Sequence, residues 1–267
     1  ILLGLVGSEM CIRDRLDLSR VIAGPVCGRT LASHGAEVIR VGAQRVPIVP
    51  NLWLDMARGK RAASIDLTSA AGRETLWRLI EDADVFVQAF RPGALAALGF
   101  GPEAVSERAP GVVYVSLSAY GHSGPWADKR GFDSLVQTAS GIGHAGAVAT
   151  GRTGTFPLPC QALDHATGYL GAFAAMMALM RRAQTGGSWH VRVSLAQTAH
   201  WLWRLGEVPG DLAHPDLSFD DVGDLLESYD TVDGRVSAVR PAQRLALTPA
   251  SWPMPPSPFS PDVTAWA

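Results

Sequence analysis

One carboxylate stands at the start of the longest apolar stretch of this 267-residue chain. Asp164 lies in the segment Gln161–Gly168, and apolar residues then follow as far as Met180. An ionised carboxylate beside such a stretch is costly unless it caps the helix, pairs with a cation or takes part in chemistry. Because aspartate is a preferred N-cap residue and suits the positive end of a helix, position alone favours capping. A catalytic role for Asp164 stays open.

Three basic residues on glycine-containing loops form a second candidate group. Lys60 precedes one predicted strand, Arg91 follows another, and Arg130 lies in the loop after a third. Open α/β sheets bind ligands at such loops, and guanidinium and ammonium groups suit phosphate oxygens. Each residue taken alone is more simply a solvated charge. Together they predict a site for a polyphosphate.

Other chemistry-bearing motifs are not found in the sequence. The first strand is followed by glycines with the wrong spacing for a dinucleotide fingerprint, and no P-loop, HExxH or GxSxG motif occurs. Histidines without ligand spacing and cysteines without CxxC spacing indicate neither a metal site nor a disulfide framework. The chain is therefore expected to hold no metal and no resident cofactor. The histidines considered are His34, His122, His144 and His165, and the cysteines are Cys11, Cys27 and Cys160.

Composition narrows the possible partners. With 23 Lys and Arg against 25 Asp and Glu, the net charge of −2 provides no field for nucleic acid, which favours small-molecule partners. The longest apolar run, Tyr169–Met180, is too short to span a bilayer and contains Gly171, so we interpret it as a buried helix. The unpaired cysteines favour a reducing, cytoplasmic setting.

The first fifteen residues need separate treatment. Ile1–Val6 is apolar but lacks the basic start and the small-residue cleavage site of an export signal. The string resembles translated sequencing-adapter text, so residues 1–15 are excluded from the predicted fold. Native sequence is expected to begin near Leu16.

From Leu16 onward the apolar period alternates between values typical of strands and of helices. This alternation predicts an α/β fold with a doubly wound, mostly parallel, Rossmann-like sheet, over residues 16–205. Residues 206–267 include an acidic stretch and six prolines between Thr248 and Pro261, so this segment is expected to wrap the surface or to be disordered. The predicted strands are 16–21, 38–41, 62–65, 85–89, 112–117 and 191–194, and the predicted helices are 24–34, 69–83, 102–107, 133–140 and 165–182.

Six segments, in this order, resemble the class III coenzyme A transferases, the CaiB/BaiF family. The resemblance extends from Leu16 to about Ala199, and the segments together are more specific than any one of them. They are Asp17-Leu18-Ser19-Arg20-Val21-Ile22-Ala23-Gly24-Pro25, Gly35-Ala36-Glu37-Val38-Ile39-Arg40-Val41, Arg58-Gly59-Lys60-Arg61 with Asp66-Leu67, Ala83-Asp84-Val85 with Phe90-Arg91-Pro92-Gly93, Ser118-Ala119-Tyr120-Gly121-His122-Ser123-Gly124-Pro125, and Gly131-Phe132-Asp133.

The resemblance implies CoA transfer with Asp164 as the nucleophile. In this family a carboxylate attacks an acyl-CoA thioester to give a mixed anhydride, and the CoA thiolate then converts the anhydride into an aspartyl-CoA thioester. An acceptor acid attacks that thioester and completes the exchange. Backbone N–H groups after Asp164, at the helix start, are expected to stabilise the oxyanions. Coenzyme A is thus a co-substrate.

The resemblance also assigns CoA-binding positions. Lys60, Arg91 and Arg130 match positions along the CoA groove, and Ile22 and Ala23 match the turn near the thioester. Oxalate-using members carry a glutamine where this chain has Ile22, so an oxalate-type substrate is disfavoured.

Two related functions remain as alternatives. The α-methylacyl-CoA racemases of the same superfamily use a histidine where this chain has Phe132, which cannot exchange a proton. The second alternative is a non-catalytic CoA-binding subunit that pairs with a full-length homologue. A flavin- or nucleotide-dependent α/β enzyme is disfavoured by the missing fingerprint.

Family members carry a small second domain that this sequence is expected to lack, because residues 206–267 resemble the family's C-terminal return to the large domain. Members form interlaced dimers that use the small domain. We therefore expect a homodimer, or a hetero-oligomer with a homologue, joined face to face. Its predicted surface is an apolar cluster comprising Trp201, Leu202, Trp203 and Leu205.

Overall fold

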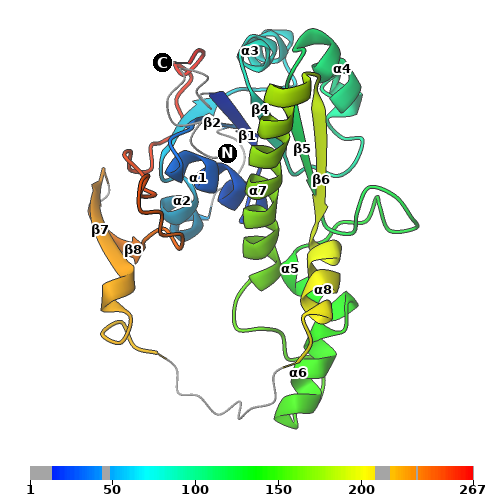
Figure 1. Ribbon diagram of the computed structural model, residues 1–267, viewed down its shortest axis with the longest axis vertical. Coiled ribbons are helices and arrows are strands. Elements are labelled where there is room, and N and C mark those ends of the chain that lie inside the picture. Colours follow the sequence, from blue (N-terminus) through cyan, green and yellow to red (C-terminus); the bar gives the residue numbers. More distant parts are fainter. Residues whose placement is uncertain (1–13, 44–48, 208–216, 233, 267) are drawn as a thin grey trace.

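The central element of the fold is a six-stranded parallel sheet (Figure 1). A computed structural model describes residues 14–43, 49–207, 217–232 and 234–266. The strand order is β3-β2-β1-β4-β5-β6, and every neighbouring pair in this sheet is parallel. The strands are β1 (Asp14–Leu18), β2 (Glu37–Gly42), β3 (Lys60–Ser64), β4 (Val85–Gln88), β5 (Val113–Ser118) and β6 (Trp189–Ser194).

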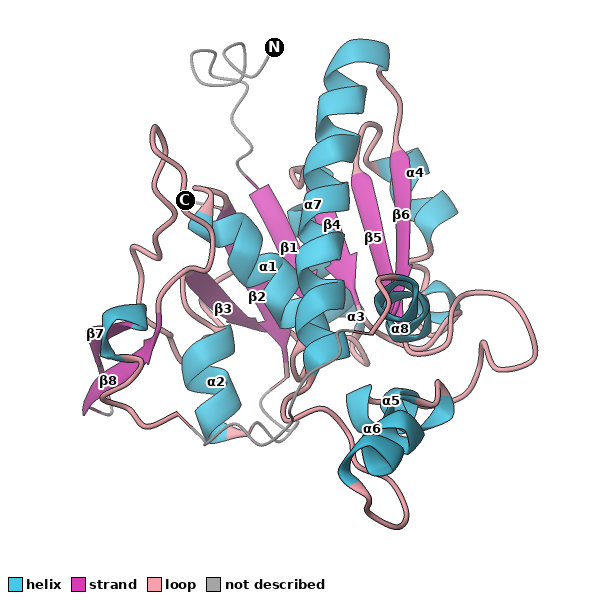
Figure 2. Ribbon diagram, turned by 60° about the horizontal axis from the view of Figure 1, so that its bottom comes forward, coloured by secondary structure: helices cyan, strands magenta, loops and turns pink. Residues whose placement is uncertain are grey.

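Helices cover both faces of this sheet, as Figures 1 and 2 show. Successive residues of a strand point to opposite faces, so strands buried on both sides are apolar throughout. In β4, Phe86 packs beneath α3 (Ala70–Glu81) and α4 (Pro102–Arg108), whereas Val85 and Val87 pack beneath α1 (Ala23–Ser33) and α7 (Ala162–Thr185). The predicted doubly wound α/β fold is therefore confirmed.

The strand order reverses between β1 and β4. Loops that leave the carboxyl ends of these two strands diverge in opposite directions, which is where open α/β sheets form their ligand crevice. The loop Ser19–Ile22 follows β1, and the loop that begins at Ala89 follows β4. The fold thus directs attention to these two loops.

Close packing of α1 on α7 fixes the position of Asp164 beside this crevice. Gly168 makes the approach possible, because a Cβ atom there would lie 2.6 Å from both the Ala23 carbonyl oxygen and the Val26 Cβ. Such a distance would force the two helices apart. The start of α7 is therefore held against the start of α1.

Within the described residues up to 207, four more α-helices accompany those that cover the sheet. The sequence pattern did not predict α2, which is only seven residues long, or α6, in which small residues leave a weak apolar period. An antiparallel pair, β7 and β8, was also not predicted, because its strands are largely exposed and carry no regular apolar period. These elements are α2 (Pro50–Met56), α5 (Asp133–Ala139), α6 (Ile142–Thr150), α8 (Leu195–Arg204), β7 (Leu226–Thr231) and β8 (Gly234–Val239).

The proline-rich C-terminal stretch lies along the edge strand β3. The Ser64 N–H donates to the Ser260 carbonyl at 2.8 Å, and the Ser260 N–H donates to the Ala62 carbonyl at 2.9 Å. Farther along, the Trp266 indole donates to the Leu79 carbonyl at 3.2 Å. This stretch covers a strand edge that would otherwise present unpaired backbone groups.

The start of β1 includes two residues that the sequence analysis assigned to the excluded segment. Asp14 and Arg15 belong to the strand, and Arg15 is buried and pairs with Asp84 at 3.2 Å. Residues 1–13 lie outside the described part of the chain.

Candidate active site

Asp164 is the third residue of α7 and does not cap it. The helix begins after Gln161, whose side chain makes no capping hydrogen bond. Asp164 is 6% exposed, and its carboxylate forms no hydrogen bond or ion pair with any described residue. The capping role that position alone favoured is therefore wrong. A buried carboxylate held without a partner at a ligand crevice is instead typical of a reactive group.

Burial raises the pKa of Asp164 from its ordinary 3.8 to about 7, and the nearby Asp133 carboxylate adds to the rise. Both effects disfavour the charged form, the first by desolvation and the second by repulsion between like charges. A carboxylate with a raised pKa is more basic, and hence more nucleophilic when ionised, than an ordinary surface aspartate.

Asp164 lines a cleft of about 80 Å³. One wall is the turn that enters α1, with Ile22 and Ala23, and another is the loop before α5, with Gly131 and Phe132. The structure thus places Ile22, Ala23 and Asp164 in one cleft. The remaining lining residues are Arg20, Val21, Gly24, Ala89, Leu117, Ser118, Ala119 and Leu195.

The turn between β1 and α1 is strained at the cleft. Val21 has a φ of 68°, a conformation that a β-branched residue rarely adopts. Gly24 is required there, since a Cβ atom would lie 2.2 Å from the Ser19 Cβ. Strain of this kind gathers where a backbone must be placed for function. The sequence carries no signal for it, because a valine ordinarily predicts extended structure.

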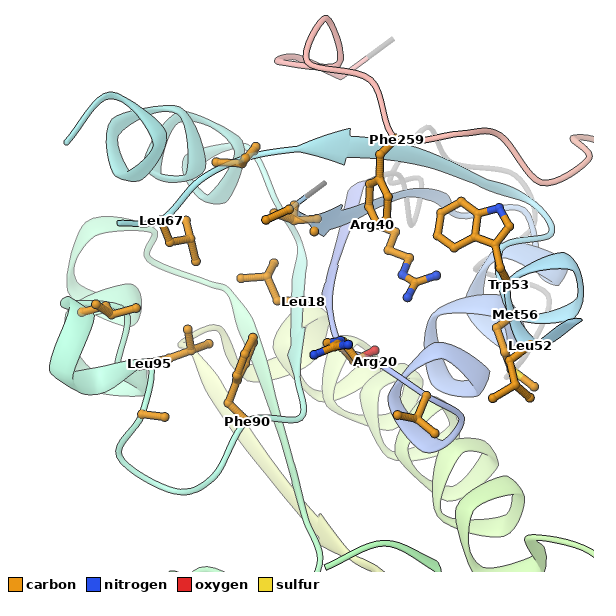
Figure 3. A pocket seen from close by; sticks show the side chains of 18 of the residues that line it. Leu18, Arg20, Arg40, Leu52, Trp53, Met56, Leu67, Phe90, Leu95 and Phe259 are labelled. Atoms are coloured by element: carbon orange, nitrogen blue, oxygen red, sulfur yellow. The ribbon is translucent and has the colours of Figure 1, made fainter. Parts of the chain in front are cut away.

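A second, larger cavity of about 330 Å³ adjoins the cleft and shares Arg20 and Val21 with it (Figure 3). Its walls come from the carboxyl ends of β1 to β4, from α2 and from the C-terminal stretch. Most lining residues are apolar, including Leu18, Leu67 and Phe90. Arg20 and Val21 thus line both the larger cavity and the cleft that contains Asp164.

Two arginines point into this larger cavity (Figure 3). Arg40 is 7% exposed, and its guanidinium stacks on Trp53 at 4.5 Å and on Phe259 at 5.6 Å. Its Nε atom has no hydrogen-bond partner in the described structure. Sequence analysis missed Arg20 and Arg40 as site residues. For Arg40 a signal existed, because a charged residue within an otherwise apolar strand is unusual.

The geometry does not support the predicted role of Lys60 in CoA binding. Its side chain is fully buried, and Nζ lies 2.7 Å from Asp17 Oδ2 and donates to the Pro25 carbonyl at 2.7 Å. Burial lowers the pKa of Lys60 to about 8, against the opposing effect of Asp17. Lys60 therefore fastens β3 to β1 and α1. Its neighbours Arg58 and Arg61 are likewise engaged in ion pairs, with Asp55, Glu227 and Glu37.

Arg91 and Arg130 are exposed and line neither cavity. Each nevertheless lies one residue from a wall: Arg91 follows Phe90 of the larger cavity, and Arg130 precedes Gly131 of the cleft. The predicted role of Arg91 and Arg130 in CoA binding stays a prediction.

The backbone N–H groups around Asp164 are already in use. The Asp164 N–H donates to Asp133 Oδ2 at 2.9 Å, and the His165 N–H donates to the Gln161 carbonyl at 3.1 Å. The expectation that N–H groups after Asp164 stabilise an oxyanion is therefore not supported. By contrast, the N–H groups of Ala23 and Gly24 at the start of α1 form no hydrogen bond with a described residue.

Comparison with known proteins gives the family. The model of CoA-transferase family III matches residues 15–214, and the chain belongs to that family. It is 33% identical over 197 residues to "Probable fatty acyl-CoA transferase Rv3272" of Mycobacterium tuberculosis, covering 69% of this chain and 50% of that protein. It is 33% identical over 185 residues to the human "Succinyl-CoA:glutarate CoA-transferase", covering 64% of this chain and 41% of that protein.

A solved structure of a CaiB/BaiF family protein has a similar fold. The crystal structure of a CaiB/BaiF family protein from Brucella suis superposes with a TM-score of 0.64 at 26% identity, covering 83% of this chain and 63% of that one. The chain spans half or less of the length of the two curated relatives.

The described residues contain no group of three or more histidine, cysteine, aspartate or glutamate residues able to hold a metal ion. Within the same residues, no helix is both long and apolar enough to cross a membrane.

Proposed function

We propose that this chain carries the CoA-binding site and the nucleophile of an enzyme that transfers coenzyme A from an acyl-CoA to a carboxylic acid. One observation supports this most: a buried Asp164, without a hydrogen-bond or ion-pair partner among the described residues, lines a cleft that shares two wall residues with a cavity containing two arginines. No resident cofactor is required for this reaction. The setting proposed is the cytoplasm, in keeping with the free thiols of Cys27 and Cys160.

The proposed reaction keeps bonds and charges in balance. An Asp164 oxygen bonds to the acyl carbonyl carbon while the carbon–sulfur bond breaks, so CoA leaves as a thiolate. The thiolate then attacks the Asp164 carbonyl of the anhydride, releasing the donor acid and leaving an aspartyl-CoA thioester. The acceptor carboxylate repeats these two steps in reverse order, forming its own CoA thioester and restoring Asp164. Positioning and oxyanion stabilisation supply most of the catalysis.

The cavities suggest where the co-substrate lies. The larger cavity is proposed to hold part of CoA, with Arg40 and Arg20 as partners for its phosphates. Arg91 and Arg130, which are exposed and adjacent in sequence to lining residues, are proposed to contact the part that extends outside. The thioester then enters the cleft. The N–H groups of Ala23 and Gly24, which take the place of those first expected on α7, are the proposed oxyanion donors.

Trapping an intermediate tests the proposal. The protein is incubated with a panel of acyl-CoA donors and carboxylate acceptors, quenched with hydroxylamine, and read by mass spectrometry for products and for a hydroxamate on the peptide that contains Asp164. Modification at Asp164 together with acceptor-CoA formation supports the proposal. If no adduct and no product form with any donor, the proposal is overturned.

Removing the charge of Arg40 is expected to weaken CoA binding. In Arg40→Gln the guanidinium that faces the cavity is lost, and the affinity should fall by about 1–3 kcal/mol, the scale of a hydrogen bond to a charged group. Calorimetry with CoA measures this loss. Arg181→Gln, at the exposed far end of α7, is the matched control and should bind as the parent does. Equal affinities in both variants would remove Arg40 from the site.

The racemase alternative is not favoured by the cleft. Phe132 is 59% exposed at its rim, and none of the residues that line the cleft is a histidine. A proton at an α-carbon would therefore lack one of its two bases. The non-catalytic subunit stays as the alternative outcome of the trapping experiment, in which CoA binds but no adduct forms.

We also propose that the protein associates with a second copy or a homologue. Tyr169, Phe173 and Met177 form an exposed apolar row along α7, and Trp201 and Leu205 are exposed on and after α8. Of the predicted cluster, Leu202 packs against the core, whereas Trp203 is exposed although its indole donates to the Ser140 carbonyl. Light scattering is expected to show a dimer, and a stable monomer with no co-purifying homologue would contradict this.

A further inference from the structure

Two polar residues on α5 face the segment that carries the nucleophile. Asp133 and Gln137 are four positions apart in the sequence and so lie on one side of the helix. They are 2% and 1% exposed, and the Gln137 amide donates to Asp133 Oδ1. Polar groups this deeply buried are costly unless their hydrogen bonds are satisfied, and a satisfied network is rigid.

The pair holds the start of α7 and the residues that lead into it. Asp133 Oδ2 accepts the Asp164 N–H at 2.9 Å. Gln137 Oε1 accepts the Leu158 N–H at 2.8 Å, and Gln137 Nε2 also donates to the Cys160 carbonyl at 3.2 Å. Three hydrogen bonds thus fix residues 158–164 to α5, and one of them ends on the nucleophile's own backbone.

The same contact sets two buried carboxylates side by side. Asp133 on α5 is the charged group that acts on Asp164, and Arg20, in the loop after β1, lines the same cleft as Asp164. His165 follows Asp164 in α7. Arg29 of α1 is paired with Asp55 and acts on His165. Burial and the Asp133 charge together raise the pKa of Asp164. An acylated Asp164 has no charge, so acylation removes the repulsion.

We infer that Asp133 and Gln137 are positioning residues for the Asp164 nucleophile, and that the Asp133 charge favours the neutral, acylated state of Asp164 over its free carboxylate. The inference rests on the proposed function for the acylation step. Interactions that are worse in the free enzyme than in the intermediate promote formation of that intermediate. A purely structural role, a cap on α7 supplied by α5, predicts no effect on the charge of Asp164.

The variant Asp133→Asn separates these two roles. It keeps the shape and an oxygen to accept the Asp164 N–H, but it removes the charge. Titration of Asp164, followed by NMR of ¹³C-carboxyl aspartate and assigned with Asp164→Asn, is expected to shift to lower pH by about one unit in Asp133→Asn. The steady-state fraction of acylated enzyme should fall about tenfold. Asp128→Asn, an exposed carboxylate on the preceding loop, is the control and should leave both values unchanged.

An unchanged Asp164 titration in folded Asp133→Asn would overturn the electrostatic part. Gln137→Met tests the positioning part, and it can be used if Asp133→Asn does not fold. Adduct formation in this variant should slow by about fivefold or more while the Asp164 titration is retained. An unchanged rate of adduct formation would overturn the positioning part. The titration needs no acyl-CoA. If the parent protein forms no adduct, the proposed function fails, and the titration still decides whether Asp133 acts on Asp164.

Discussion

Replacing Asp164 by asparagine or alanine is expected to reduce CoA transfer by about three orders of magnitude or more. The proposed route passes through two covalent states of this side chain, and neither replacement can form them; removal of a covalent nucleophile has effects of this size. The measurement is the rate of acceptor-CoA formation together with the trapped adduct at residue 164. Calorimetry should show that both variants still bind CoA. A variant that transfers CoA at the parental rate would contradict the assignment of Asp164.

The stability of Asp164→Asn serves as a control for unfolding, because burial of the charged Asp164 carboxylate destabilises the parent protein. Its pKa is about 7 in the folded chain against an ordinary 3.8, so the folded state binds more protons between these pH values and stability falls as pH rises through that window. Above the window the penalty is fully present. Asp164→Asn should therefore be more stable than the parent at pH 8, on the order of 2–4 kcal/mol, and equally stable near pH 3.5. Loss of activity in a protein that became more stable cannot be attributed to unfolding.

Much of the fold could be predicted from the sequence because the elements of the sheet carry strong local patterns. The run Val85–Val87 is apolar on both faces, which is typical of a central parallel strand, and β4 lies between β1 and β5. The long apolar segment after Asp164 similarly predicted α7. Elements with weak or mixed patterns were missed, as in β7 and β8, where an exposed ribbon has no core face to impose a period.

The candidate site was less accessible from sequence, since it depends on what is brought together in space. Asp164 was identified by its place before an apolar helix and by family resemblance, but only the packing shows it uncapped and beside Asp133. Arg40 was passed over because its charge within an apolar strand marks it as unusual but does not indicate which cavity its side chain reaches. Lys60 failed for the opposite reason: a lysine in a glycine-containing loop pattern resembles a phosphate contact until burial and an acidic neighbour are known.

The buried pair of Lys60 and Asp17 leads to the second large effect. Lys60→Met is expected to lower the free energy of unfolding by about 3–5 kcal/mol, because it leaves the Asp17 carboxylate buried without its cation. Among the described residues, Asp17 then keeps the Ser19 N–H and hydroxyl as donors, which do not neutralise it. Denaturant unfolding followed by circular dichroism measures the change. Lys129→Met, at an exposed lysine, is the control and should change stability by less than about 0.5 kcal/mol.

A double variant shows whether the loss comes from the unpaired charge or from the missing side chain. In Lys60→Met/Asp17→Asn both charges are gone, and replacing a buried ion pair by neutral groups is often close to neutral in stability. The double variant should therefore recover at least about half of the loss, with a coupling energy in the range measured for contacting residues. Folded Lys60→Met should also bind CoA as the parent does, since the ammonium lies beneath α1 and not in either cavity. A fall in CoA affinity without a fall in stability would return Lys60 to the CoA site and contradict its structural role.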